Sequence, residues 1–208
     1  MTLNPFKQLS LFFVVSVFVI TWIDPRWPME QALHSSLTVI GLTWLTWHAK
    51  KYPMKNLDFF AICFLIAIHC VAARWLYSNV PYDDWFKAAF NWSPQEAFGF
   101  ERNHFDRLIH FLYGVCFMPA IANFIRVKNN IRMRSALAIG LMIIMASSLI
   151  YEWVEWAIAL TMSPEQAEAY NGQQGDVFDA QKDMWMATAG ALLALILMHR
   201  NYRQWKKA

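Results

Sequence analysis

The stretch SALAIGLMIIMASSLIYEWVEWAIAL, residues 135–160, decides the fold class because it is long and apolar enough to cross a membrane. It also carries two glutamates, Glu152 and Glu155, inside the apolar run. An ionised carboxylate in hydrocarbon is costly unless it is paired, neutralised or hydrated, so such residues usually face the interior of a bundle and mark a working site. Residues three apart share one side of a helix, so both glutamates can face one cavity. The alternative is that Glu155 only solvates the helix end at the membrane boundary.

The composition of the whole chain predicts a single polytopic membrane domain, residues 1–208, whose partner is the lipid bilayer. Of its residues 57% are hydrophobic and 16% aromatic, and the mean hydropathy is +0.25. The net charge is only +3 and no basic stripe is present, so we expect no nucleic-acid partner. The three cysteines fall in apolar runs without C-x-x-C spacing and are interpreted as packing residues. Nothing in the sequence indicates an oligomeric state.

Further apolar runs on both sides of the opening stretch predict an all-α bundle of six transmembrane helices. The third run is extended to Tyr77 because a spanning helix needs about 17–25 residues. The patterns SPQE at residues 93–96 and SPEQ at residues 163–166 resemble helix capping boxes, and they predict short interfacial helices in the outer connections. The predicted spans are residues 8–23, 31–49, 58–77, 104–126, 135–160 and 180–199.

The distribution of basic residues predicts the orientation of this bundle. In a six-span arrangement, twelve of the 18 Lys and Arg residues lie on the side of the two termini, and most of the acids lie on the other side. By the positive-inside rule, both termini are expected in the cytoplasm and the acidic connections are expected outside.

Unusual polar residues then converge at the outer ends of four predicted spans. They share helix faces because they recur at spacings of three, four or seven residues. Several carboxylates at close range cannot all stay ionised, and a divalent cation would resolve that repulsion. Carboxylates with one imidazole suit Zn, Mn, Fe or Mg. The expected metal ligands are His110, Glu155, Asp179 and Asp183, the expected catalytic residues are Glu152 and Asp106, and the expected substrate-binding residues are Arg74 and Arg107.

Three functional hypotheses follow from these residues. The leading one is a metal-dependent hydrolase or transferase that acts on a lipid or an envelope metabolite at the outer face. The second is a proton-coupled transporter that uses Glu152 and Glu155 as a relay, although the first half of the chain has no counterpart of the acidic motifs. The third is a structural or accessory subunit, in which arginines neutralise the acids and fix the register of the helices.

Three motifs carry a family resemblance: NHFDRLIH at residues 103–110, YEWVE at residues 151–155 and QGDVFDAQKD at residues 174–183. With them the chain resembles the YjdF family of bacterial inner membrane proteins over nearly its whole length. The resemblance implies a multi-pass location in the bacterial inner membrane. The family is classed as a domain of unknown function, so no catalytic residue transfers from it. Signatures such as H-E-x-x-H, the Walker A loop and G-x-S-x-G are absent.

Overall fold

The computed structural model describes the backbone of residues 2–205, together with their side chains except at residues 169 and 200–205. The described chain is all-helical and contains no strand. Its helices are α1 (Pro5–Thr21), α2 (Pro28–Lys51), α3 (Asn56–Arg74), α4 (Tyr82–Phe90), α5 (Pro94–Phe98), α6 (Phe105–Asn129), α7 (Met133–Ala159), α8 (Pro164–Asn171) and α9 (Asp179–Trp205).

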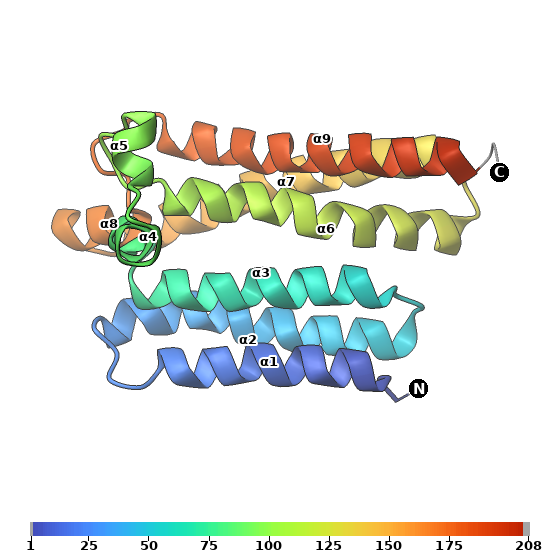
Figure 1. Cartoon of the computed structure of the whole chain (residues 1–208), viewed down its shortest axis with the longest axis horizontal. Coiled ribbons are helices and arrows are strands. Elements are labelled where there is room, and N and C mark those ends of the chain that lie inside the picture. Colours follow the sequence, from blue (N-terminus) through green and yellow to red (C-terminus); the bar gives the residue numbers. More distant parts are fainter. Residues whose placement is uncertain (1, 206–208) are drawn as a thin grey trace.

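The six long helices form two three-helix units that lie side by side (Figure 1). The first unit contains α1, α2 and α3, and the second contains α6, α7 and α9. Each unit has its own apolar core, centred on Phe59 and Ile62 in the first and on Met118 and Ile144 in the second. The packing of α3 against α6 joins them.

Three of these helices, α3, α6 and α7, are long and apolar enough to cross a membrane. Helix α1 is also apolar but has only 17 residues. Neither α2 nor α9 passes the same test within the described residues. The polar face of α2, which includes Gln31 and His34, and the acidic start of α9 account for this, because both place polar groups inside the bundle.

Helix α3 ends at Arg74, three residues before the predicted end at Tyr77. The next residues explain the stop, because Leu76 and Tyr77 have φ angles of 48° and 54°, in the left-handed region. Tyr77 is held there because its hydroxyl is hydrogen-bonded to His69 and its ring packs on His34. Arg74 itself turns toward α1, where it donates to the backbone carbonyls of Thr21, Ile23 and Asp24.

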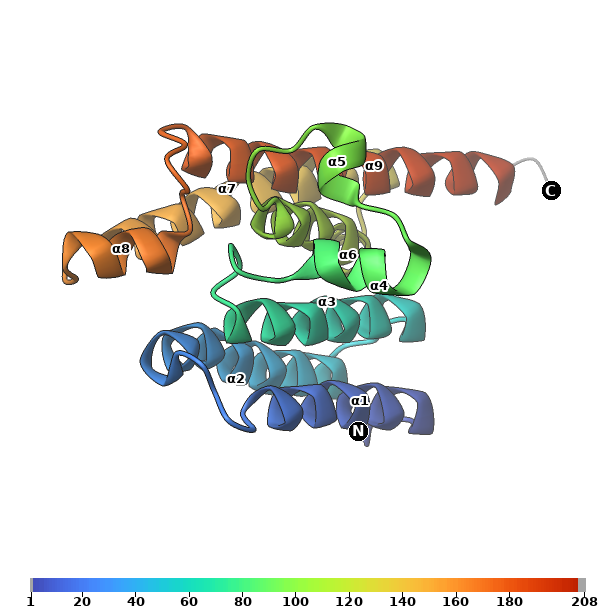
Figure 2. The same cartoon turned by 60° about the vertical axis from the view of Figure 1, so that its left-hand side comes forward.

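The short helices α4, α5 and α8 gather at the end of the bundle opposite the start of α1 and the end of α9 (Figure 1). In Figure 2, α4 and α5 lie in front of the long helices and α8 lies to one side. Helices α5 and α8 begin at the two predicted caps. The Ser93 hydroxyl accepts from the backbone N–H of Glu96, and Ser163 and Gln166 form a complete capping box. Asp83 of α4 accepts hydrogen bonds from Ser93 and from the Gln95 N–H, which fixes α4 against α5.

Candidate functional site

The centre of the site is a cluster of Asp106 and His110 on α6 with Asp183 on α9. One potential ligand atom from each residue lies within 4.8 Å of the other two. Asp106 and His110 are one helical turn apart, and the Asp106 Oδ1 lies 3.6 Å from the His110 Nε2. Helix α9 packs along α6 and brings Asp183 to the same depth. We call these three residues the acid–histidine cluster.

Glu152 of α7 extends the cluster to a third helix. Its Oε1 lies 3.9 Å from the His110 Nε2, and Glu152 is buried. Among the described residues, this Oε1 and the Oδ1 of Asp183 have no hydrogen-bond partner. Buried carboxylate oxygens nearly always have one, so two such oxygens beside one imidazole suggest a ligand site.

A separate layer of ion pairs lies next to the cluster, at the start of α9 one turn before Asp183. Arg102 donates to Asp179 at 2.6 Å, and Arg107 contacts the same carboxylate at 3.2 Å. Arg107 also pairs with Asp176, which Lys182 reaches at 2.6 Å. This arginine–aspartate layer ties the loop before α6 to the loop and first turn of α9.

Asp176 lies outside the spanning segments and is held in its charged form. The ammonium of Lys182 contributes most to this, and the Phe178 N–H and Arg107 add to it, so the pKa of Asp176 lies well below its usual range although burial opposes the shift. This carboxylate is therefore ionised at neutral pH and neutralised by its basic neighbours.

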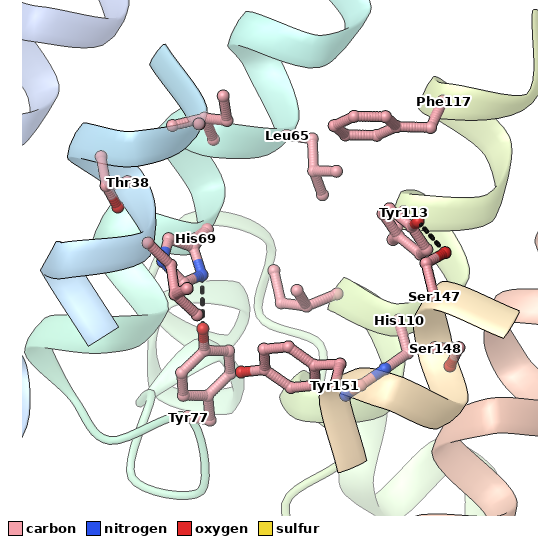
Figure 3. A pocket seen from close by; sticks show the side chains of 14 residues that line it. Thr38, Leu65, His69, Tyr77, His110, Tyr113, Phe117, Ser147, Ser148 and Tyr151 are labelled. Carbon is pink, nitrogen blue, oxygen red and sulfur yellow. Dashed lines mark hydrogen bonds between the residues drawn. The ribbon is translucent and has the colours of Figure 1, made fainter. Parts of the chain in front are cut away.

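Two cavities flank the acid–histidine cluster. A polar cavity of about 410 Å³ lies between α7, α8 and α9, and Glu152, Glu155, Asp179 and Asp183 line it. A mainly apolar cavity of about 280 Å³ lies between the two three-helix units, and His110 forms part of its wall (Figure 3). The cluster thus stands between a polar space and an apolar one.

Most of the residues singled out in the sequence meet here. Asp106, His110, Glu152 and Asp183 come together, and Glu155 lines the adjoining polar cavity. The prediction for Arg74 has no support in its position, because its guanidinium is bound to the carbonyls at the end of α1.

Two features of the site were not foreseen from the sequence. Asp179 was expected as a metal ligand, but its carboxylate is bound by two arginines. One of them, Arg102, precedes α6 in an irregular segment, where no helical periodicity connects it to the other polar residues.

The sequence matches a known protein family over almost its whole length. The model of a family described as "Predicted membrane protein (DUF2238)" matches residues 6–204. The chain belongs to the DUF2238 family. This DUF2238 protein is also 30% identical over 187 residues to Inner membrane protein YjdF of Escherichia coli (strain K12), across 88% of this chain and 84% of that protein. The expected resemblance is confirmed, and no solved structure matches the chain.

Proposed function

We propose that this DUF2238 protein is a metal-dependent hydrolase or transferase of the bacterial inner membrane, with its site open to the periplasm. The observation that carries the proposal is the acid–histidine cluster, in which three potential ligand atoms lie within 4.8 Å of one another. Ligand atoms around a first-row divalent ion are separated by at most about 4.4 Å, since each bond is about 2.0–2.2 Å long. Small side-chain movements would close the cluster on one ion.

In this proposal Asp106, His110 and Asp183 are the metal ligands. Two carboxylates and one imidazole suit Zn, Mn or Fe, with Mg less favoured because of the imidazole. Such an ion would polarise a phosphoryl or carbonyl oxygen and lower the pKa of a bound water. Asp179 is assigned to the arginine–aspartate layer instead, because Arg102 and Arg107 already neutralise it.

Glu152 is proposed as the general base. It is buried beside His110, and its Oε1 accepts no hydrogen bond from the described residues, so this oxygen is available to take a proton from a nucleophile. The polar cavity gives a substrate access to Glu152 and Asp183, and Glu155 lies in the same wall. Arg107 has a buried Nε without a partner in the described chain, so it can still donate to an anionic substrate group.

The proposed topology has six spans with both termini in the cytoplasm. It is supported by the six long helices and by the start of α1 and the end of α9 at one end of the bundle, where the α2–α3 and α6–α7 connections also lie (Figure 1). Basic residues concentrate in and around these two connections, at residues 50–55 and 126–134. The short helices and the acid–histidine cluster then lie at the periplasmic side.

The proposal is tested by metal analysis of the protein purified in mild detergent. We expect about one divalent ion per chain. The Asp183→Asn variant should lower the metal affinity at least about tenfold, because the loss of an outer-sphere partner alone costs that much. Asp84→Asn, an exposed acid on α4, is the inert control. Asp179→Asn is the sharper control, because Asp179 lies one turn from Asp183 but is bound by arginines, so this variant should retain the ion.

The competing results are distinct. A wild-type protein that binds no divalent ion after supplementation would overturn the proposal. Equal loss of metal from Asp179→Asn and Asp183→Asn, with both variants folded, would contradict the assigned ligand set.

A further inference from the structure

The apolar cavity of about 280 Å³ is formed by side chains of α2, α3, α6 and α7. Its polar residues are not evenly spread. Tyr77, His110 and Tyr151 gather at one end, whereas Leu65 and Phe117 form the other (Figure 3). The cavity therefore has a polar end next to the acid–histidine cluster and a mainly apolar end away from it.

The length and depth of this cavity match part of one membrane leaflet. His110 and Phe117 are seven residues apart on α6, which is a rise of about 10 Å. Half of a typical hydrocarbon core is about 15 Å thick. Because α6 starts at Phe105 on the side of the cluster, the cavity extends from that side toward the middle of the bundle.

The volume is large enough for part of an alkyl chain. An engineered apolar cavity of about 150 Å³ binds benzene, and the present cavity is larger. Water is disfavoured at the apolar end, because Leu65, Ile66 and Phe117 offer no hydrogen bonds and the nearby hydroxyls of Tyr113 and Ser147 are bonded to each other.

A chain can reach the cavity from the lipid side. Along the described chain, α2 and α7 form opposite walls of the cavity without packing extensively on each other. Gly41 lies in the α2 wall, and a Cβ added there would meet nothing within 4 Å. Small residues thus form the two facing walls, with Gly41 on α2 and Ser147 and Ser148 on α7.

We infer that this cavity holds one alkyl chain of an amphiphilic substrate whose polar head lies at the acid–histidine cluster. The inference rests on the proposed function, for which it names the substrate class: a membrane lipid rather than a water-soluble metabolite. Ser148 supports it, because its hydroxyl is buried in the cavity wall without a partner among the described groups. This hydroxyl can donate to the ester oxygen at the junction of head and chain.

The role of the cavity is to position the substrate more than to increase its affinity. A lipid chain is already surrounded by apolar groups in the bilayer, so its transfer into an apolar cavity yields little free energy. Holding the chain fixes the depth and orientation of the head, and this positioning is what accelerates a reaction at a fixed site.

The experiment uses the whole protein in liposomes that contain a phosphatidylethanolamine with a diazirine in the middle of one acyl chain. After illumination, labelled residues are identified by peptide mass spectrometry. We expect a label on Leu65, which is only 5% exposed and is reached through the cavity rather than from the outer surface. Gly41→Leu and Ser148→Leu fill the cavity from opposite walls, and each should reduce the label on Leu65 several-fold.

Ser36→Leu is the matched control, because Ser36 is an exposed serine on the outer side of α2. It adds the same bulk outside the cavity and should leave the label on Leu65 unchanged. Thermal unfolding of all variants identifies any that fail to fold, and the two filling variants act through different helices. An unchanged label on Leu65 in both folded filling variants would overturn the inference.

Metal content measured on the same samples separates this inference from the proposed function. If the metal is present and filling the cavity has no effect on the label, the chain site is wrong and the metal site stands. If filling removes the label and no sample contains metal, the chain site stands and the metal-dependent function is wrong.

Discussion

Two aspartates one turn apart on α9 have opposite environments. Asp179 and Asp183 are almost equally buried, at 4% and 3% exposed. Asp179 is bound by Arg102 and Arg107, whereas the Oδ1 of Asp183 has no partner in the described chain. A buried charge that is already paired fixes the arrangement of the helices. A buried charge without a partner is costly unless it binds a ligand or takes up a proton. This contrast is why the proposal assigns Asp183 to the metal site and Asp179 to the arginine–aspartate layer.

Replacing Arg102 tests the structural half of this contrast. Arg102→Ala leaves Asp179 with Arg107 alone, and removing one partner of a buried ion pair costs about 3–5 kcal/mol. We expect the lower end of that range, about 3 kcal/mol, which corresponds to a fall in Tm of roughly 6–12 °C for a chain of this size. Thermal unfolding in detergent measures it.

Two further variants control this experiment. Arg132→Ala removes an exposed arginine at the opposite end of the bundle and should leave Tm nearly unchanged. The double variant Arg102→Ala/Asp179→Asn also removes the buried carboxylate that has lost one of its two arginines, so it should be more stable than Arg102→Ala alone. A double variant that is less stable by the full sum of the single effects would contradict the pairing.

The sequence predicts the residue types of this site better than their partners. The acids and His110 stand out because charged groups are rare in apolar helices, and spacing on one helix follows from its period. Which arginine meets which aspartate depends on the axial register of α6 against α9 and on the path of the preceding loop. Both the register and the loop path are set by packing between helices. The contribution of Arg102 and the pairing of Asp179 therefore could not be predicted from the local sequence pattern.

At the scale of the elements, α6 and α9 approach each other closely at Gly114 and Gly190. A Cβ on Gly114 would overlap the carbonyl oxygen of Ala187, and one on Gly190 would overlap that of Phe111. Small residues allow this approach, which in a membrane supplies packing that the hydrophobic effect does not. The contact sets the register that brings Asp183 beside His110.

Enlarging one of these glycines should therefore destabilise the bundle. We expect Gly190→Ala to cost about 1–3 kcal/mol, because backbone atoms of α6 would have to move. Gly41→Ala is the matched control: it changes a glycine within a helix where a Cβ meets nothing, so it should be neutral or stabilising by about 0.5–1 kcal/mol. Equal Tm values for the two variants would rule out the close crossing.

The stability of the contact between α4 and α5 should depend on pH through the carboxyl group of Asp83. Burial raises the pKa of this carboxyl, but hydrogen bonds from the Gln95 N–H and Ser93, together with Lys87, outweigh it and hold the pKa below the ordinary 3.8. A lowered pKa in the fold contributes stability that is present above pH 3.8 and is lost as the pH falls through the folded value.

The measurement compares wild type with Asp83→Asn by hydrogen exchange of the peptide that covers α4 and α5. At neutral pH the variant should exchange faster. The difference should shrink as the pH drops below 3.8, because the wild-type carboxyl then becomes neutral as well. A difference that persists undiminished at pH values well below this would show that Asp83 acts through shape rather than charge.

Element boundaries were predictable where a cap is encoded locally. Ser93 and Ser163 precede proline and a polar residue at the third helical position, and α5 and α8 begin there. The end of α3 was misplaced, because the left-handed backbone at Tyr77 depends on contacts with His34 and His69, which come from other parts of the bundle.

For the whole molecule, the division into two three-helix units explains why the site lies where it does. Each unit has its own core, and a third cluster with Leu65 and Ile109 joins α3 to α6. The apolar cavity beside His110 lies between the two units, next to this third cluster. The acids of the candidate site, Asp106, Glu152 and Asp183, all belong to the second unit, which places the proposed chemistry on α6, α7 and α9.

The proposed topology makes a prediction for the intact cell. All three native cysteines are buried, so an introduced cysteine should dominate labelling by a membrane-impermeant maleimide. Asp84→Cys on α4 should be labelled in cells whose outer membrane is permeabilised. Lys55→Cys, between α2 and α3, should be labelled only after lysis.

Each alternative topology has its own labelling pattern. Labelling of Lys55→Cys but not Asp84→Cys before lysis would mean that the acid–histidine cluster faces the cytoplasm and that the positive-inside rule fails for this chain. Labelling of both positions would mean that they lie on the same side, so that α3 does not cross the membrane. Because the proposed periplasmic substrate depends on the orientation, the first of these results would move the search for that substrate to the inner leaflet while leaving the metal ligands in place.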